Sequence, residues 1–209
     1  MEHLLQSEKT FRYFTQGNIL QAKKLIYVLH GYGQLAEFFL KNFQELDSDY
    51  YVVAPEGMHR FYLQGTSGRV GASWMTKEAR EQDIHDTLQW LNQLDHKICT
   101  QTTFEQKIIL GFSQGGATAA RWHSLGKIKA NTFISWASVF PPDLGHTISD
   151  KLKEKQQNYF IIGKDDQYFT DNEKENILEY YKQNNFKTIV FEGKHVINMD
   201  ALKIILKEL

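Results

Sequence analysis

Residues 107–122 read KIILGFSQGGATAARW, and this stretch decides the fold class because its character changes at its centre. The opening KIIL is a short apolar run, which favours a buried strand. The residues after Ser113 are mostly small and predict a helix over about 114–124. A strand that passes through a sharp, glycine-flanked turn into a helix is typical of α/β proteins.

The same alternation of strand and helix runs along most of the chain. Apolar runs predict strands at 9–15, 24–29, 50–54, 107–110, 132–137, 159–162 and 187–191. Apolar residues at helical spacing predict helices at 34–46, 77–95, 114–124, 171–184 and 198–208. The glycine-containing stretch 55–76 reads as a long irregular loop, which in a compact domain is usually functional. We therefore predict an α/β fold with a mostly parallel sheet that binds ligands at the carboxyl ends of its strands.

Length and composition indicate one compact unit. The chain has 209 residues, 42% of them hydrophobic, and shows no internal repeat, low-complexity tract or linker. We predict a single domain over residues 1–209. Cys99 is the only cysteine, and no Cys/His cluster has the spacing of zinc ligands, so we expect neither an internal disulfide nor a metal site.

Charge and apolar run lengths exclude two classes of partner. The 24 Lys and Arg residues balance 25 Asp and Glu residues, and no basic stripe with interleaved aromatics is present, so we do not expect nucleic-acid binding. The opening MEHLLQSEKT lacks the features of a signal peptide. No apolar run approaches the roughly 18–20 residues that span a bilayer. We expect a cytoplasmic protein that does not insert into membranes.

The turn at residues 111–115 has the G-x-S-x-G pattern, in which small residues let a serine hydroxyl project from a strained turn. Ser113 is therefore a candidate nucleophile. Its position between a predicted strand and a predicted helix strengthens this interpretation. The alternative is an ordinary hydroxyl in a tight turn.

A nucleophilic serine needs a base and an acid that orients it. In chains with this turn the order is serine, then Asp or Glu, then His, with the later groups on loops after strands. Asp165 and Asp166 follow the strand predicted at 159–162, and His195 follows the strand at 187–191. Placement therefore selects His195 as the base, while either aspartate remains a candidate for the acid.

Backbone amides are the expected stabilisers of an oxyanion, one after the serine and one in the loop after an early strand. We assign the amides of Gln114 and Tyr32 to this role. His30 begins the HGYG loop at residues 30–33, and we expect it to brace this loop rather than transfer protons.

Aromatic residues near predicted strand ends are candidates for walls of a substrate pocket. They are Phe61, Tyr62 and Trp74 in the long loop, and Trp136 and Phe140 around the end of the strand at 132–137. The alternative for each ring is that it simply fills the core.

Five segments together resemble the phospholipase/carboxylesterase family of α/β-hydrolases, which includes the acyl-protein thioesterases. They are residues 30–33 (HGYG), 111–116 (GFSQGG), 138–141 (SVFP), 163–166 (GKDD) and 193–195 (GKH). The resemblance implies an α/β-hydrolase fold with helices on both faces of the sheet, no large cap domain and no cofactor or metal. It also implies a triad of Ser113, Asp166 and His195. The chain departs from the family pattern at Ile162, at residues 167–169 (QYF) and at Lys194.

The predicted function is hydrolysis of a small carboxylic ester or thioester through an acyl-enzyme, with a small molecule as substrate. Two alternatives stay open at this point. The first is a serine peptidase or C–C hydrolase of the same fold. The second is a hydrolase-like binding module without turnover.

Overall fold

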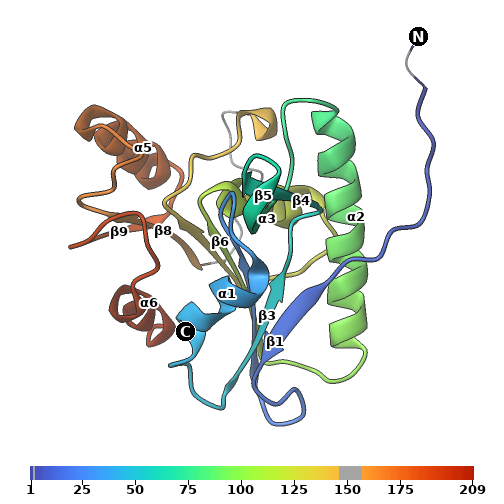
Figure 1. Cartoon of the computed structure of the whole chain (residues 1–209). Helices are drawn as coiled ribbons and strands as arrows, with labels where there is room; N and C mark the ends of the chain where they lie inside the picture. The colour runs from blue at the N-terminus through green and yellow to red at the C-terminus, as the bar shows by residue number, and fades with distance from the viewer. Residues whose placement is uncertain (2, 146–156) are drawn as a thin grey trace.

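A computed structural model describes residues 1, 3–145 and 157–209 and contains a seven-stranded sheet with strand order β1-β3-β2-β6-β7-β8-β9 (Figure 1). The strands are β1 Tyr13–Gln16, β2 Lys24–Leu29, β3 Tyr50–Pro55, β6 Gln106–Phe112, β7 Thr132–Trp136, β8 Gln157–Gly163 and β9 Lys187–Phe191. Every neighbouring pair is parallel except β1 and β3, which are antiparallel. The predicted mostly parallel α/β sheet is therefore confirmed.

Helices cover both faces of this sheet. Residues from α2 (Arg80–Cys99), α3 (Gln114–Leu125) and α5 (Asp171–Gln183) pack in one core cluster. Residues from α1 (Ala36–Leu40), the 3₁₀ helix η1 (Lys41–Phe43) and α6 (Met199–Leu206) pack in the other. Alternate residues of β2 point into opposite clusters, Leu25 into the first and Ile26 into the second. A strand buried on both faces needs apolar residues at every position, which explains the continuous apolar runs.

The stretch predicted as a long irregular loop contains a β-hairpin instead. Its strands are β4 (His59–Gln64) and β5 (Ser67–Ser73), which pair with each other and not with the main sheet. The turn starts at Gly65, whose φ of 71° suits the first position of a two-residue hairpin turn. A second difference is the helix predicted at 34–46, which ends early as α1 and η1.

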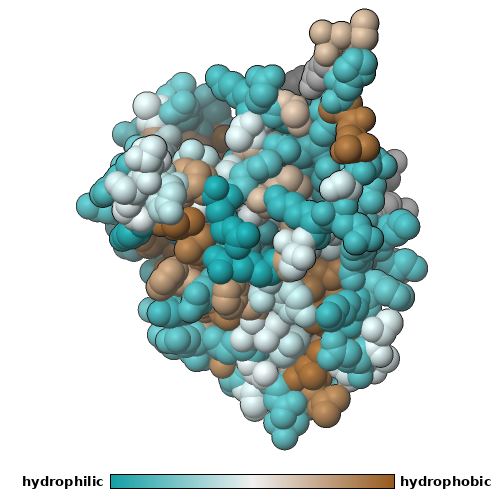
Figure 2. All heavy atoms as spheres, turned by 45° about the vertical axis from the view of Figure 1, so that its right-hand side comes forward, coloured by the Kyte–Doolittle hydropathy of each residue, from teal (hydrophilic) through white to brown (hydrophobic). Residues whose placement is uncertain are grey.

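The surface on the side of α2 is mainly hydrophilic, and the first residues of the chain project beyond this helix (Figures 1 and 2). The N-terminal segment meets the body where the Phe11 ring stacks on Trp90 of α2, with centroids 4.9 Å apart. Among the described residues, no helix is both long and apolar enough to cross a membrane. No large cap domain covers the described part of the sheet edge, and a single domain over the whole chain stays a prediction.

Candidate active site

Ser113 lies at the point where β6 ends and α3 begins. Its backbone has φ of 54° and ψ of −123°, a conformation that costs a non-glycine residue about 1–3 kcal/mol. Two hydrogen bonds hold it: the Ser113 N–H donates to Trp136 O at 2.9 Å, and Ser113 O accepts from the Gly116 N–H at 2.9 Å. This strained strand-to-helix turn is the geometry that projects a nucleophile from the edge of a sheet.

The glycines around Ser113 are required by close backbone contacts. A Cβ on Gly111 would lie 2.4 Å from Gly115 O, and one on Gly115 would lie 2.3 Å from Leu29 O. A Cβ on Gly116 would lie 2.4 Å from the Cβ of Ser138. These distances leave no room for a side chain, so the GFSQGG sequence brings β6, α3 and the end of β2 into direct contact.

His195 lies in the loop after β9, and its Nδ1 is 2.7 Å from Asp166 Oδ2 in the loop after β8. The side chain of Asp166 is fully buried, and its Oδ1 accepts the Tyr168 N–H at 3.0 Å. Asp165 is exposed, and its backbone N–H donates to Gly193 O at 2.9 Å. The structure therefore places Asp166, and not its neighbour, against the imidazole.

The imidazole of His195 also lies between two aromatic rings. Phe112, the residue before Ser113, approaches it at 4.7 Å between centroids, and Tyr168 approaches at 4.5 Å. Gln167 Oε1 accepts the His195 backbone N–H at 3.4 Å. The sequence does not predict these contacts, and its one signal for them is that residues 167–169 depart from the family pattern.

The loop after β2 lies beside the serine. A Cβ on Gly31 would lie 3.2 Å from the Cβ of Ser113. Among the described residues, no acceptor pairs with the backbone N–H of Tyr32 or with that of Gln114. These two amides are therefore free to donate to a negatively charged oxygen, as the sequence predicted for an oxyanion site.

His30 is a structural part of this loop. It is fully buried, its Nε2 accepts the Gly57 N–H at 2.9 Å, and its Nδ1–H donates to Gly31 O at 2.8 Å. Burial lowers the pKa of His30 to about 4, so the ring is neutral near pH 7. Both ring nitrogens are occupied by backbone groups, which agrees with the predicted bracing role.

The side chain of Gln114 connects the start of α3 to the segment after β5. Its Oε1 accepts the Trp74 N–H at 3.1 Å, and its Nε2 donates to Met75 O at 3.0 Å. Trp74 continues the connection, because its indole N–H donates to His30 O at 2.8 Å. The segments that carry the two free amides are therefore joined through two side chains, those of Gln114 and Trp74. The sequence signal for this link is the glutamine of GFSQGG, whose side chain can both donate and accept.

The hairpin β4–β5 packs against the loop after β2. The Gly33 N–H donates to Ala72 O at 2.9 Å, and the Ala72 N–H donates to Gln34 O at 3.0 Å. The ring of Phe61 lies 5.1 Å from that of Tyr32. The predicted substrate residues Phe61 and Tyr62 therefore lie on the hairpin that contacts the loop beside Ser113, and Tyr62 is 51% exposed.

The other three predicted substrate residues are buried, which corrects their assignment as pocket walls. Trp74 is 1% exposed, Trp136 is 0% exposed and Phe140 is 6% exposed. The Trp136 indole N–H donates to Val196 O at 3.0 Å, and Phe140 packs on Tyr181. With so little accessible surface, these three side chains do not form walls of an open substrate pocket. Their contacts support the loops around the site instead.

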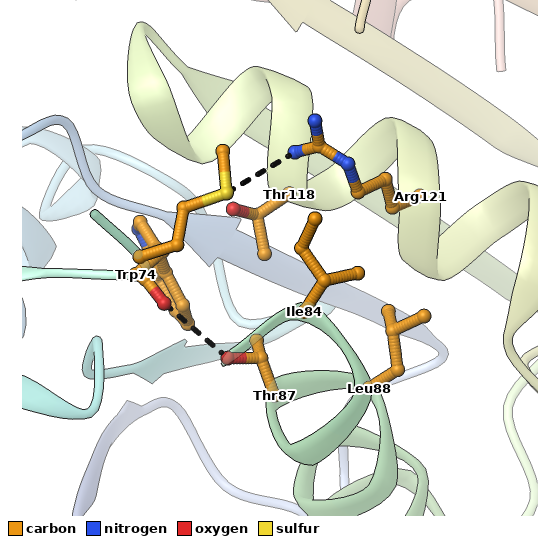
Figure 3. A pocket seen from close by; sticks show the side chains of 7 residues that line it. Trp74, Ile84, Thr87, Leu88, Thr118 and Arg121 are labelled. Atoms are coloured by element: carbon orange, nitrogen blue, oxygen red, sulfur yellow. Dashed lines mark hydrogen bonds between the residues drawn. The ribbon is translucent and has the colours of Figure 1, made fainter. Parts of the chain in front are cut away.

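A small cavity lies between α2 and α3, behind Trp74 (Figure 3). Its lining residues are Trp74, Met75, Ile84, Thr87, Leu88, Thr118 and Arg121. Arg121 is buried, and its Nε and Nη2 donate to Asp143 at 2.8 and 2.6 Å, which holds the pKa of that carboxyl below its usual range. Because the arginine charge is already neutralised and none of the lining residues is a candidate nucleophile, base or acid, we assign this cavity no catalytic role.

Comparison with known proteins agrees with this geometry. The fold is similar to the crystal structure of esterase PE8, with a TM-score of 0.71 and 19% identity over 96% of this chain and 99% of that one. It is similar to acyl-protein thioesterase 2 of Zea mays, with a TM-score of 0.71 and 13% identity over 94% and 96% of the two chains. It is also similar to the Bacillus cereus carboxylesterase, with a TM-score of 0.66 and 15% identity over 95% and 92%. At these identities the likeness establishes the α/β-hydrolase fold.

The sequence comparisons add the family. A search of curated proteins found no match. The model of the family described as serine hydrolase (FSH1) matches residues 20–203, which is most of the chain and includes every residue of the candidate site. The prediction of a serine hydrolase is therefore confirmed, and the chain belongs to the serine hydrolase (FSH1) family.

Proposed function

We propose that this serine hydrolase is a carboxylesterase that cleaves small carboxylic esters or thioesters through an acyl-enzyme intermediate. The observation that carries the proposal is the 2.7 Å hydrogen bond between His195 Nδ1 and the buried Asp166. This bond leaves Nε2 as the ring nitrogen that exchanges protons with Ser113. The strands that carry the three residues, β6, β8 and β9, belong to one parallel part of the sheet, so their carboxyl ends lie on the same edge.

In the proposed acylation step, Ser113 Oγ attacks the ester carbonyl while His195 Nε2 takes its proton. The carbonyl π electrons move to oxygen and form a tetrahedral oxyanion. This intermediate collapses, the bond to the leaving group breaks, and His195 gives the proton to the departing oxygen or sulfur. Water then repeats the sequence on the acyl-enzyme and releases the acid. Asp166 orients the imidazole and stabilises its cation.

The oxyanion in this mechanism receives hydrogen bonds from the backbone amides of Tyr32 and Gln114. Removal of one such donor costs about 2.7–4 kcal/mol of transition-state stabilisation in well-studied enzymes. The support for this role is that neither amide has an acceptor among the described residues, that Gln114 follows Ser113 in the chain, and that Gly31, the residue before Tyr32, lies beside Ser113.

The substrate class is proposed from the structural neighbours, which include an esterase, a carboxylesterase and an acyl-protein thioesterase. Phe61 and Tyr62 are the predicted aromatic residues that keep accessible surface near the site. We propose that they contact the substrate. A small molecule as the natural substrate and a cytoplasmic location stay predictions from the sequence.

A fluorophosphonate probe tests the proposal without knowledge of the natural substrate, because it reacts with activated serines. We expect mass spectrometry to find one adduct, on the peptide that contains Ser113. The adduct should be lost in Ser113→Ala and kept in Ser67→Ala, a control on the exposed hairpin. An adduct at another residue, or no adduct on the folded wild-type protein, would contradict the proposal.

A further inference from the structure

Tyr168 presents an aromatic surface directly beside the imidazole of His195. Its side chain is 70% exposed, and its ring meets the imidazole edge to face, with centroids 4.5 Å apart and an interplanar angle of 61°. Phe112 also contacts the imidazole but is only 3% exposed. Within the described part of the chain, two rings contact His195, and of these only Tyr168 has accessible surface for a substrate.

The chemistry of the proposed function determines which part of a substrate lies near this ring. His195 Nδ1 is bonded to Asp166, so Nε2 must give the proton to the leaving group. Proton transfer requires the leaving oxygen to lie within about 2.6–3.2 Å of Nε2. Atoms attached to that oxygen are then within reach of a ring packed against the same imidazole. Val196, the next residue, is 50% exposed and adds apolar surface beside His195.

We propose that Tyr168 forms a leaving-group subsite that favours esters of flat, aromatic alcohols or thiols. The inference rests on the proposed function and specifies its substrate class. Aromatic pairs prefer offset or edge-to-face contacts and contribute beyond the area that they bury. Tyr168 is held in place for such a contact, because its backbone N–H donates to Asp166 Oδ1 at 3.0 Å.

The two-step mechanism separates this role from simple orientation of His195. The leaving group is present during acylation and has departed before deacylation. A subsite for the leaving group therefore changes kcat/KM according to the ester used and leaves hydrolysis of the acyl-enzyme unchanged. A residue that only orients the imidazole changes both steps, whatever the leaving group.

The experiment compares phenyl acetate with trifluoroethyl acetate, which form the same acetyl-enzyme. We expect Tyr168→Ala to lower kcat/KM for the phenyl ester about 3- to 10-fold more than for the trifluoroethyl ester. The intrinsic reactivities of the two esters cancel when the ratio of their kcat/KM values in the variant is compared with the same ratio in the wild type. Tyr168→Phe keeps the ring and should keep the wild-type ratio. Phe38→Ala, which removes an exposed ring from α1, is the matched control and should also keep it.

The rate of acetyl-enzyme decay, measured in a single turnover, should be the same in Tyr168→Ala and the wild type. Equal losses for both esters with slower decay would overturn the inference and assign Tyr168 to imidazole orientation. An unchanged ratio would also overturn it, because the ring would then lie outside the path of the leaving group. If the wild-type protein hydrolyses no ester, or if the probe forms no adduct on Ser113, the proposed function itself is overturned.

Discussion

The two halves of the candidate site position their reactive side chains in different ways. In the serine half, residues 30–34 and 111–116, backbone touches backbone: a Cβ on Gly115 would lie 2.3 Å from Leu29 O. In the histidine half, residues 163–168 and 193–196, backbone also touches backbone, since a Cβ on Gly163 would lie 2.4 Å from Gly193 O, but the imidazole itself is held by the side-chain bond between Asp166 and His195. Glycines therefore bring the loops together in both halves, whereas the nucleophile is aimed by its own strained backbone and the imidazole by a bond to another side chain.

The largest expected effect is at the reacting atom of the serine half. Ser113→Ala should lower kcat for ester hydrolysis by roughly 10⁶, as removal of the nucleophile does in subtilisin. The variant should fold normally, because the backbone bonds of residue 113 to Trp136 and Gly116 do not use the side chain. Steady-state kinetics measure the loss of kcat, and circular dichroism checks that the variant is folded. Substantial residual hydrolysis, with probe labelling at another residue, would reject the assignment.

The next effect tests whether one side chain defines the histidine half. Asp166→Asn should lower kcat on the order of 10⁴, because the amide favours the wrong imidazole tautomer. Asp165→Asn is the matched control one residue away, and it should cost about tenfold or less since that side chain is exposed. The kcat values of both purified variants, measured at one pH, decide which aspartate is the acid. A crippled Asp165→Asn variant would move the acid by one residue, and two active variants would place the acid on another loop.

A smaller effect sharpens the comparison inside the serine half. Gln114→Leu keeps the backbone amide and removes the side-chain bonds to Trp74 and Met75. Because misplacement of a catalytic group by about 1 Å can cost 10²-fold, we expect kcat to fall by up to about 10² with little change in KM. Gln93→Leu, on the exposed face of α2, should have wild-type kinetics. An unchanged kcat in Gln114→Leu would show that the oxyanion loops are positioned without this link.

The smallest effect concerns stability and the neutral state of His30. Its pKa is about 4 in the folded protein and about 6.5 in an unfolded chain, so the unfolded state binds more protons between these values. His30 therefore contributes a stability that is full above pH 6.5 and declines as the pH falls towards 4. Between pH 7 and pH 5 the loss should be about 2 kcal/mol.

Urea unfolding of the wild type and of His30→Gln at both pH values measures this loss. Glutamine keeps a donor and an acceptor for Gly31 and Gly57 but does not titrate. We expect the free energy of unfolding of His30→Gln to change less with pH than that of the wild type. Identical changes in the two proteins would show that His30 does not titrate in this range.

The central strands were predictable because they are buried on both faces, which gives continuous apolar runs such as KLIYVL, whose bounds match β2. The bounds of KTIVF match β9, although this edge strand is only partly buried. The hairpin was not predictable by the same rule. The apolar run of β4, FYL at residues 61–63, is half-buried at its first position and exposed at the other two, so it is not the mark of a strand buried on both faces. The helix predicted at 34–46 was too long. The prediction overshot because the apolar spacing continues beyond the end of α1, through η1 and into the turn that follows.

Prediction of the candidate site from the sequence was limited in the same way. The turn at Ser113 could be predicted directly, because its glycine spacing reflects backbone contacts that are close in sequence. Trp74 and Trp136 were predicted as pocket walls because sequence does not reveal the partners of their indole N–H groups, His30 O and Val196 O, which lie 44 and 60 residues away. The contact of Tyr168 with His195 also joins two separate loops, so no local pattern indicates it.

The most direct test of the central claim, that Ser113 and His195 act as one unit, is a double-mutant cycle on kcat. Ser113→Ala and His195→Ala should each lower kcat by roughly 10⁶, and the double variant should be no slower than either single one, because neither residue works without the other. Losses that multiply in the double variant would contradict the account, as would a His195→Ala variant that keeps most of its activity.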